Sequence, residues 1–180
     1  ITIGERAFSG CSFRGELILP KDLQTLSQEC FYGNDFSGEL KLPKNVANID
    51  RKAFACNGRL TGTLEIPEDV ANIGAGAFAQ CSSLEKIILP SSLEFIAYEN
   101  QEGGAFEDCF GINSIVCKGT MPPDIHSGAF NGVAKDNFTV EVPESAVSLY
   151  QSANGWREFK RIAAHHELVC RPSVASALST

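Results

Sequence analysis

A phenylalanine preceded by a small residue recurs along this chain at nearly one spacing. Successive phenylalanines lie 23, 23, 24, 28 and 24 residues apart. Periods of about 20 to 50 residues are typical of solenoids and other stacked repeats. Because a unit of this size cannot bury its apolar face alone, the copies are expected to stack and share one continuous core. The pairs are Ala7-Phe8, Cys30-Phe31, Ala53-Phe54, Ala77-Phe78, Ala105-Phe106 and Ala129-Phe130.

Each copy also contains a short alternating segment that ends at a proline in five of the six copies. In segments such as 63–66 and 86–89, every second residue is apolar, which predicts a strand with one buried face. A second apolar pair, such as Leu23 and Leu26, follows each of the first four prolines. About five residues, around 98–103, are inserted before Phe106, and insertions of this kind usually form loops on one face. The prolines are Pro20, Pro43, Pro67, Pro90 and Pro143, and Lys118 takes this place in the remaining copy.

The clearest copy is residues 73–90, which read Ile-Gly-x-x-Ala-Phe-x-x-Cys and then Leu-x-x-Ile-x-Leu-Pro. This pattern resembles the BspA-like leucine-rich repeats, which are common on surface proteins of gut and oral Bacteroidetes and occur in some parasitic protists. Residues 117–159 resemble the closing segment of that family. The resemblance implies an α/β repeat solenoid, a right-handed leucine-rich-repeat superhelix. It would be β-rich with short helical turns, and would contain about six repeats of 23–24 residues and a C-terminal cap.

The boundaries follow from where the pattern stops. We expect residues 1–162 to form the leucine-rich-repeat domain, with the cap at about 143–162, and residues 163–180 to be a tail or a linker to a further domain. In the cap, Trp156 and Phe159 supply the bulk that covers the core of the last repeat. The chain begins within the second half of a repeat, so we expect either upstream repeats or a partner at that edge.

Composition and cysteine pattern exclude several classes of function. The net charge of −7 argues against a nucleic-acid partner, because phosphate binding needs clustered Lys and Arg. No apolar run approaches the ~20 residues of a membrane-spanning helix. The seven cysteines form no CxxC pair, so the usual zinc and redox spacings are missing. Cys11, Cys81 and Cys109 share an interior turn column with Asn34 and Asn57, which predicts small structural side chains and no disulfides.

Candidate chemistry is sparse. The three histidines have no partner pattern for metal binding or nucleophilic catalysis. The family motif contains no catalytic residue either. We therefore predict a protein that is not an enzyme, with no catalytic, cofactor-binding or metal-binding residue. Four glutamates alternate with buried strand residues, so they either solvate the exposed face of the sheet or belong to a binding surface. These are Glu16, Glu39, Glu65 and Glu141.

The exposed strand face also carries apolar residues, and it is the candidate binding surface. Ile88 and Val116 would be neighbours in the predicted register and would form a small patch. Shape and resemblance favour a non-enzymatic protein-binding or adhesion module of a secreted or cell-surface protein, with a host or bacterial surface protein as partner. A structural spacer and a glycan-binding module are the alternatives. The candidate contact residues are Lys86, Ile88, Val116 and, in the insertion, Tyr98 and Asn100.

Overall fold

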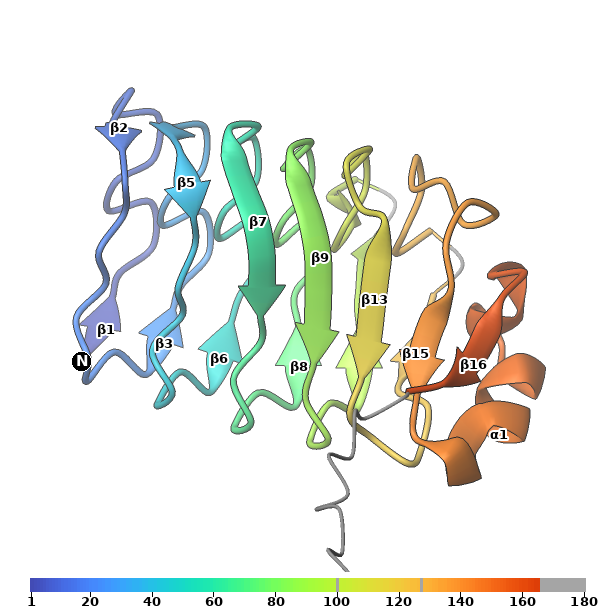
Figure 1. The fold of residues 1–180 in the computed structure, drawn as a ribbon. Coiled ribbons are helices and arrows are strands. Elements are labelled where there is room, and N and C mark those ends of the chain that lie inside the picture. Colours follow the sequence, from blue (N-terminus) through green and yellow to red (C-terminus); the bar gives the residue numbers. More distant parts are fainter. Residues whose placement is uncertain (100, 127, 166–180) are drawn as a thin grey trace, which may run out of the picture.

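The computed structural model describes residues 1–99, 101–126 and 128–165, and it confirms the solenoid (Figure 1). The chain runs down one face of the body in one set of parallel strands and up the opposite face in another. The first set, the long-strand sheet, has the order β16-β15-β13-β9-β7-β5. Its strands are β5 (Gly38–Glu39), β7 (Leu60–Glu65), β9 (Leu84–Leu89), β13 (Ser114–Cys117), β15 (Val140–Val142) and β16 (Ile162–Ala164).

The opposite face is a second parallel sheet, the short-strand sheet. Each of its strands has two residues, of which the second is apolar and points into the core. This sheet is formed by the apolar pairs that follow the prolines, and Ile49 and Ile73 lie in register within it. Its strands are β1 (Thr2–Ile3), β3 (Thr25–Leu26), β6 (Asn48–Ile49), β8 (Asn72–Ile73), β10 (Phe95–Ile96) and β14 (Asp124–Ile125).

Two smaller pairings complete the strands of the described residues. At the N-terminal end, β2 (Arg14–Gly15) pairs in parallel with β4 (Asp35–Phe36). The insertion folds into an antiparallel hairpin of β11 (Tyr98–Glu99) and β12 (Gly103–Gly104). The insertion therefore forms a loop on one side of the body, as the sequence predicts.

The core between the two sheets is one continuous cluster of apolar side chains. The predicted inward positions of the alternating segments, such as Leu64, Ile87 and Ile115, are fully buried. The repeating phenylalanines stack face to face along the solenoid axis, with ring centroids 5.2 to 5.6 Å apart. Offset stacking at this distance adds to the stabilisation from burial. Neighbouring copies are therefore held together by the same contact at every step.

The column that alternates between Asn and Cys forms a second ladder. Asn57 Nδ2 donates to the carbonyl oxygens of Phe54 (2.8 Å) and of Phe31 in the preceding copy (2.9 Å). Cys81 Sγ donates in the same way to Phe54 O at 3.3 Å, and Cys109 Sγ to Phe78 O at 3.1 Å. Asn and Cys are interchangeable here because each is small and offers a donor to the buried phenylalanine carbonyl of the preceding copy.

The expected cap closes the C-terminal end of the core. It contains the helical turns η1 (Glu144–Ala146), α1 (Val147–Ser152) and η2 (Trp156–Glu158). Gly155 has a φ of +76°, which lets the chain turn back after α1. Trp156 is fully buried and donates from Nε1 to Pro123 O at 2.8 Å. After the helical turns of the cap, the chain adds β16 to the long-strand sheet. This strand begins at Ile162 and ends at Ala164, so the ordered sheet continues two residues past the expected end of the domain.

Candidate binding surface

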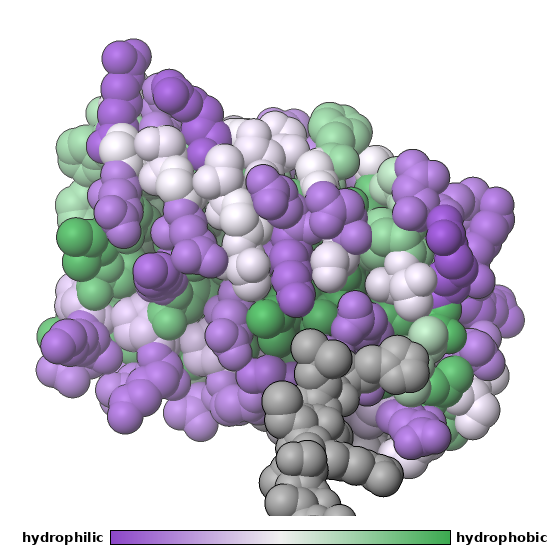
Figure 2. Space-filling view, viewed as in Figure 1, coloured by the Kyte–Doolittle hydropathy of each residue, from purple (hydrophilic) through white to green (hydrophobic). Residues whose placement is uncertain are grey.

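The exposed face of the long-strand sheet brings Ile88 and Val116 side by side. The register pairs Val116 with Ile88 on one side and with Glu141 on the other, and it pairs Ile88 with Glu65. The apolar pair thus lies between two glutamates in one row across four strands. Figure 2 shows a hydrophobic patch over β9 and β13 among hydrophilic side chains.

These two residues lie in a groove of about 580 Å³, the long-strand groove. Ile88 is partly exposed, whereas Val116 is only 8% exposed and forms the floor. The sequence suggested an exposed valine, but Val116 is nearly buried at its place between Ile88 and Glu141. The groove is lined by Lys86, Ile88, Val116, Cys117, Lys118, Pro143 and His165.

Polar side-chain contacts close the groove at two sides. Lys118 reaches across the end of β9, and its Nζ lies 2.8 Å from Glu65 Oε1 and 3.0 Å from Glu68 Oε1. The hydrogen bond to Glu65, together with that to Glu68, raises the pKa of Lys118 above its usual value. On the other side, His165 Nδ1 lies 2.5 Å from Glu141 Oε2. Both pairs are partly exposed, so each contributes little to stability and mainly defines the rims.

Lys86 is different from the other charged groups of this groove. Its side chain is partly exposed, and within the described part of the chain it makes no ion pair. It is paired in register with Thr63 and Ser114, which are uncharged. Lys86 can therefore offer its charge to a carboxylate of a partner without first breaking an internal contact.

The insertion residues lie elsewhere. The β11–β12 hairpin is tied to the turns beside the short-strand sheet, where Glu99 pairs with Arg51 (3.3 Å) and Glu102 with Lys52 (2.7 Å). Tyr98 belongs to this hairpin through its backbone pairing with Gly104. Asn100 lies outside the described residues. Three of the five candidate residues therefore share one groove, whereas Tyr98 lies in the hairpin, outside that groove.

Sequence reasoning missed Lys118, Pro143 and His165 as groove residues. Lys118 carried a signal, because it replaces a proline that recurs in the other five copies. His165 carried none, since its position depends on β16, where the register pairs Ala164 with Val142. Its backbone N–H continues this pairing by donating to Val142 O at 2.7 Å.

Most of the cysteines are buried, but the interior position expected for Cys11 is wrong. Cys11 is exposed, and its Sγ reaches only Ser9 O of its own copy at 3.6 Å, whereas Cys81 and Cys109 donate to the preceding copy. Cys11, Cys30, Cys56, Cys81, Cys109 and Cys117 are all free thiols, which confirms the prediction of no disulfides for every cysteine that the structure describes. Burial raises the pKa of the Cys109 thiol to about 12 and holds that of Cys81 well above its ordinary value. A buried, protonated thiol is a poor nucleophile.

We expect this difference to appear in thiol labelling. In the native protein at mildly alkaline pH, iodoacetamide should modify the exposed Cys11, while Cys81 and Cys109 react at least about 100-fold more slowly. Site-resolved mass spectrometry of labelled peptides measures the rates, with urea-unfolded protein as the control in which all sites react alike. Equal native rates at Cys11 and Cys81 would contradict the buried ladder.

The described residues contain neither a metal-binding cluster nor a membrane-spanning helix. No group of three or more His, Cys, Asp or Glu side chains is arranged to hold a metal ion. Among the same residues, no helix has the length and apolarity required to cross a membrane.

The repeat determines the family. The sequence profile of the BspA type leucine-rich repeat region matches residues 1–135 in six copies. This chain belongs to that family. All six phenylalanines of the ladder, Phe8 to Phe130, lie within the matched residues. Leucine-rich repeats of this kind are generally protein-interaction modules.

Comparison with other proteins adds two distant structural likenesses. A leucine-rich cell surface protein from Faecalibacterium prausnitzii A2-165 is 15% identical, with a TM-score of 0.36 over 93% of this chain and 58% of that one. A leucine-rich repeat protein from Bacteroides ovatus ATCC 8483 is 14% identical, with a TM-score of 0.25 over 91% of this chain and 72% of that one. The chain thus spans 58% of the first of these proteins. None of the curated proteins compared with it matches.

Proposed function

We propose that this chain is a non-enzymatic protein-binding or adhesion module of a secreted or cell-surface protein, and that the long-strand groove is its contact site. The observation that carries the proposal is the pairing of Ile88 with Val116 in a groove whose wall includes Lys86, a lysine with no ion pair in the part of the chain that the structure describes. Interfaces depend on a few apolar or aromatic anchors that enter pockets, surrounded by a polar rim. The partly exposed Ile88, the floor at Val116 and the two polar rims at Lys118 and His165 provide such a site.

The chemistry of the groove indicates what a partner must present. An apolar side chain would pack on Ile88 and Val116, and a neighbouring carboxylate would pair with Lys86. A host or bacterial surface protein with such a segment would bury about 800 Å² on each side of a standard interface. Because Lys86 is partly exposed, its contribution should weaken as salt is added.

Substitution of Ile88 tests the site. The purified chain, coupled to beads, is assayed for binding to host extracellular-matrix proteins and to epithelial cells. We expect Ile88→Asp to lower binding at least about 10-fold, because a carboxylate would replace the apolar anchor. Val116 is unsuitable for this substitution, since a charge in the nearly buried floor would destabilise the fold itself.

Ile18→Asp is the matched control. Ile18 has the same position in the first copy, is 83% exposed and lies outside the groove, so binding should not change. Circular dichroism verifies that both variants are folded. Equal binding by the Ile88 and Ile18 variants would refute the groove as contact site. Failure of the unmodified chain to bind any of these surfaces would favour a structural spacer instead.

A further inference from the structure

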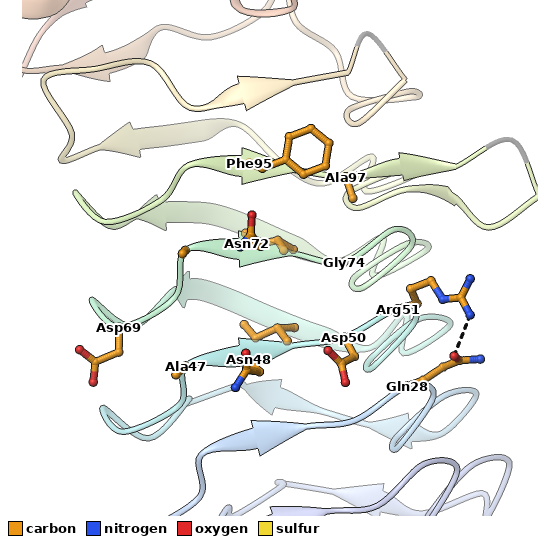
Figure 3. A pocket seen from close by; sticks show the side chains of 13 residues that line it. Gln28, Ala47, Asn48, Asp50, Arg51, Asp69, Asn72, Gly74, Phe95 and Ala97 are labelled. Carbon is orange, nitrogen blue, oxygen red and sulfur yellow. Dashed lines mark hydrogen bonds between the residues drawn. The ribbon is translucent and has the colours of Figure 1, made fainter.

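A second groove lies on the opposite face of the solenoid, and it differs in chemistry from the first. This short-strand groove has a volume of about 560 Å³ and lies over β6, β8 and β10. Figure 3 shows Asn48, Asn72 and Phe95 one after another along the solenoid axis, each from a different strand. The register pairs Asn72 with Phe95, and the pairing of Ile49 with Ile73 places Asn48 beside Asn72.

The depth of this groove comes from small residues on either side of the row. Ala47 and Ala71 precede the two asparagines, and Gly74 and Ala97 stand two positions after Asn72 and Phe95. A Cβ on Gly74 would approach the backbone carbonyl carbon of Asp50 to 2.6 Å, so no larger residue fits there without a shift. Longer side chains, Asp69 at one edge and Arg51 at the other, border the depression (Figure 3).

The row offers hydrogen-bonding groups that the protein does not use. Within the described residues, the Asn72 side chain makes no hydrogen bond, and that of Asn48 makes one long contact of 3.5 Å to Thr25 Oγ1. A carboxamide presents a donor and an acceptor side by side, which suits the paired hydroxyl groups of a sugar. Phe95 is 40% exposed and supplies an apolar ring on which the C–H face of a sugar can pack.

The charged side chains that line this groove favour neutral sugars over acidic ones. Asp50 and Asp69 line the groove. Among the described residues that line it, the one cation is Arg51, which pairs with Glu99 at 3.3 Å and donates to Gln28 Oε1 at 2.9 Å. Phosphate, sulfate and carboxylate groups would be repelled from this wall, whereas neutral hydroxyl groups would not. Three neighbouring strands span about 10 Å, which is the length of a disaccharide.

We propose that the short-strand groove binds a neutral oligosaccharide through Asn48, Asn72 and Phe95, with a footprint of about two sugar units. The ring of Phe95 holds one sugar by its apolar face, and the two carboxamides bind the hydroxyl groups of the next. This site is separate from the long-strand groove, so neither proposal depends on the other. An open groove of this kind binds weakly, with a Kd near 1 mM for a single site.

A glycan array followed by NMR titration tests this proposal. The array presents neutral oligosaccharides beside sialylated and sulfated ones, and the neutral disaccharide that binds best is titrated into isotope-labelled protein. We expect binding to neutral glycans only, with amide shifts in β6, β8 and β10. Phe95→Ala and Asn72→Ala should each weaken binding at least about 10-fold. Either variant alone suffices if the other fails to fold.

Two control variants separate this site from its surroundings. Asp124→Ala changes the next residue of the same row, which pairs with Phe95 but lies outside the groove, and it should leave glycan binding unchanged. Ile88→Asp on the opposite face should do the same. The proposal is overturned if no neutral glycan binds at millimolar concentration, if acidic glycans or a peptide bind here instead, or if Phe95→Ala and Asn72→Ala bind like Asp124→Ala.

Discussion

Replacing Phe78 by alanine should lower the free energy of unfolding by about 3–5 kcal/mol. The ring is fully buried and stacks on Phe54 at 5.6 Å and on Phe106 at 5.5 Å, so its removal leaves a cavity and breaks the ladder in the middle. For a protein of this size the loss corresponds to a Tm about 10 °C lower. Urea unfolding followed by circular dichroism, and by the fluorescence of the single tryptophan, measures the change.

Phe8→Ala is the matched control for this substitution. Phe8 has the same position in the first copy, but it is 38% exposed and has one ladder neighbour, Phe31. Its replacement should cost less than half as much, because fewer contacts are lost and solvent already reaches the site. If both variants lost equal stability, the stacked ladder would not be the source of the effect.

Trp156→Ala should lower the free energy of unfolding by a similar amount, about 3–5 kcal/mol. The loss of structure should begin in the copies next to the cap. Trp156 contacts the rings of Tyr150, Phe130 and Phe159, at centroid distances of 5.1, 6.2 and 5.9 Å. Each repeat touches mainly its neighbours, so loss of the cap first opens the copies next to it. Hydrogen exchange should increase in β14, β15 and β16 before it increases in β6 and β8.

Trp156→Phe separates the contribution of ring packing from that of the indole hydrogen bond. The variant keeps an apolar ring but loses the N–H that binds Pro123 O, which leaves a buried carbonyl without its partner. We expect a loss of about 1–3 kcal/mol, smaller than that of the alanine variant. Uniform exchange throughout the chain in the Trp156→Ala variant would contradict the local role of the cap.

The sequence predicted the fold because every copy repeats the same burial pattern. Phenylalanine, the alternating segment and the proline recur in register, so each inward position could be read six times. The Asn and Cys column was likewise readable, since Asn57 and Cys81 occupy one place with one kind of hydrogen bond. The apolar pairs after the prolines were visible too. Their two-residue strands were not predicted, because a strand of this length has no periodicity of its own.

The groove residues were harder to predict, because a groove depends on the sizes and burial of side chains that neighbouring strands bring together. The register placed Ile88 beside Val116, but the burial of Val116 depends on its surroundings on several strands. The pairing of His165 with Glu141 requires a strand beyond the last recognisable repeat. The short-strand groove depends on small residues such as Gly74. The close approach of Gly74 to the backbone of the preceding copy becomes visible only in the stacked structure.

The hairpin of the insertion alters how the copies depend on one another. It precedes Phe106, yet its glutamates pair with Arg51 and Lys52, which precede Phe54, so it passes over the intervening turn. Gly76 makes this passage possible, because a Cβ there would meet Glu102 O at 2.5 Å. In an array with nearest-neighbour contacts alone, any internal boundary can open independently. The hairpin adds contacts between second neighbours, so opening of the turn between them would also break these two ion pairs.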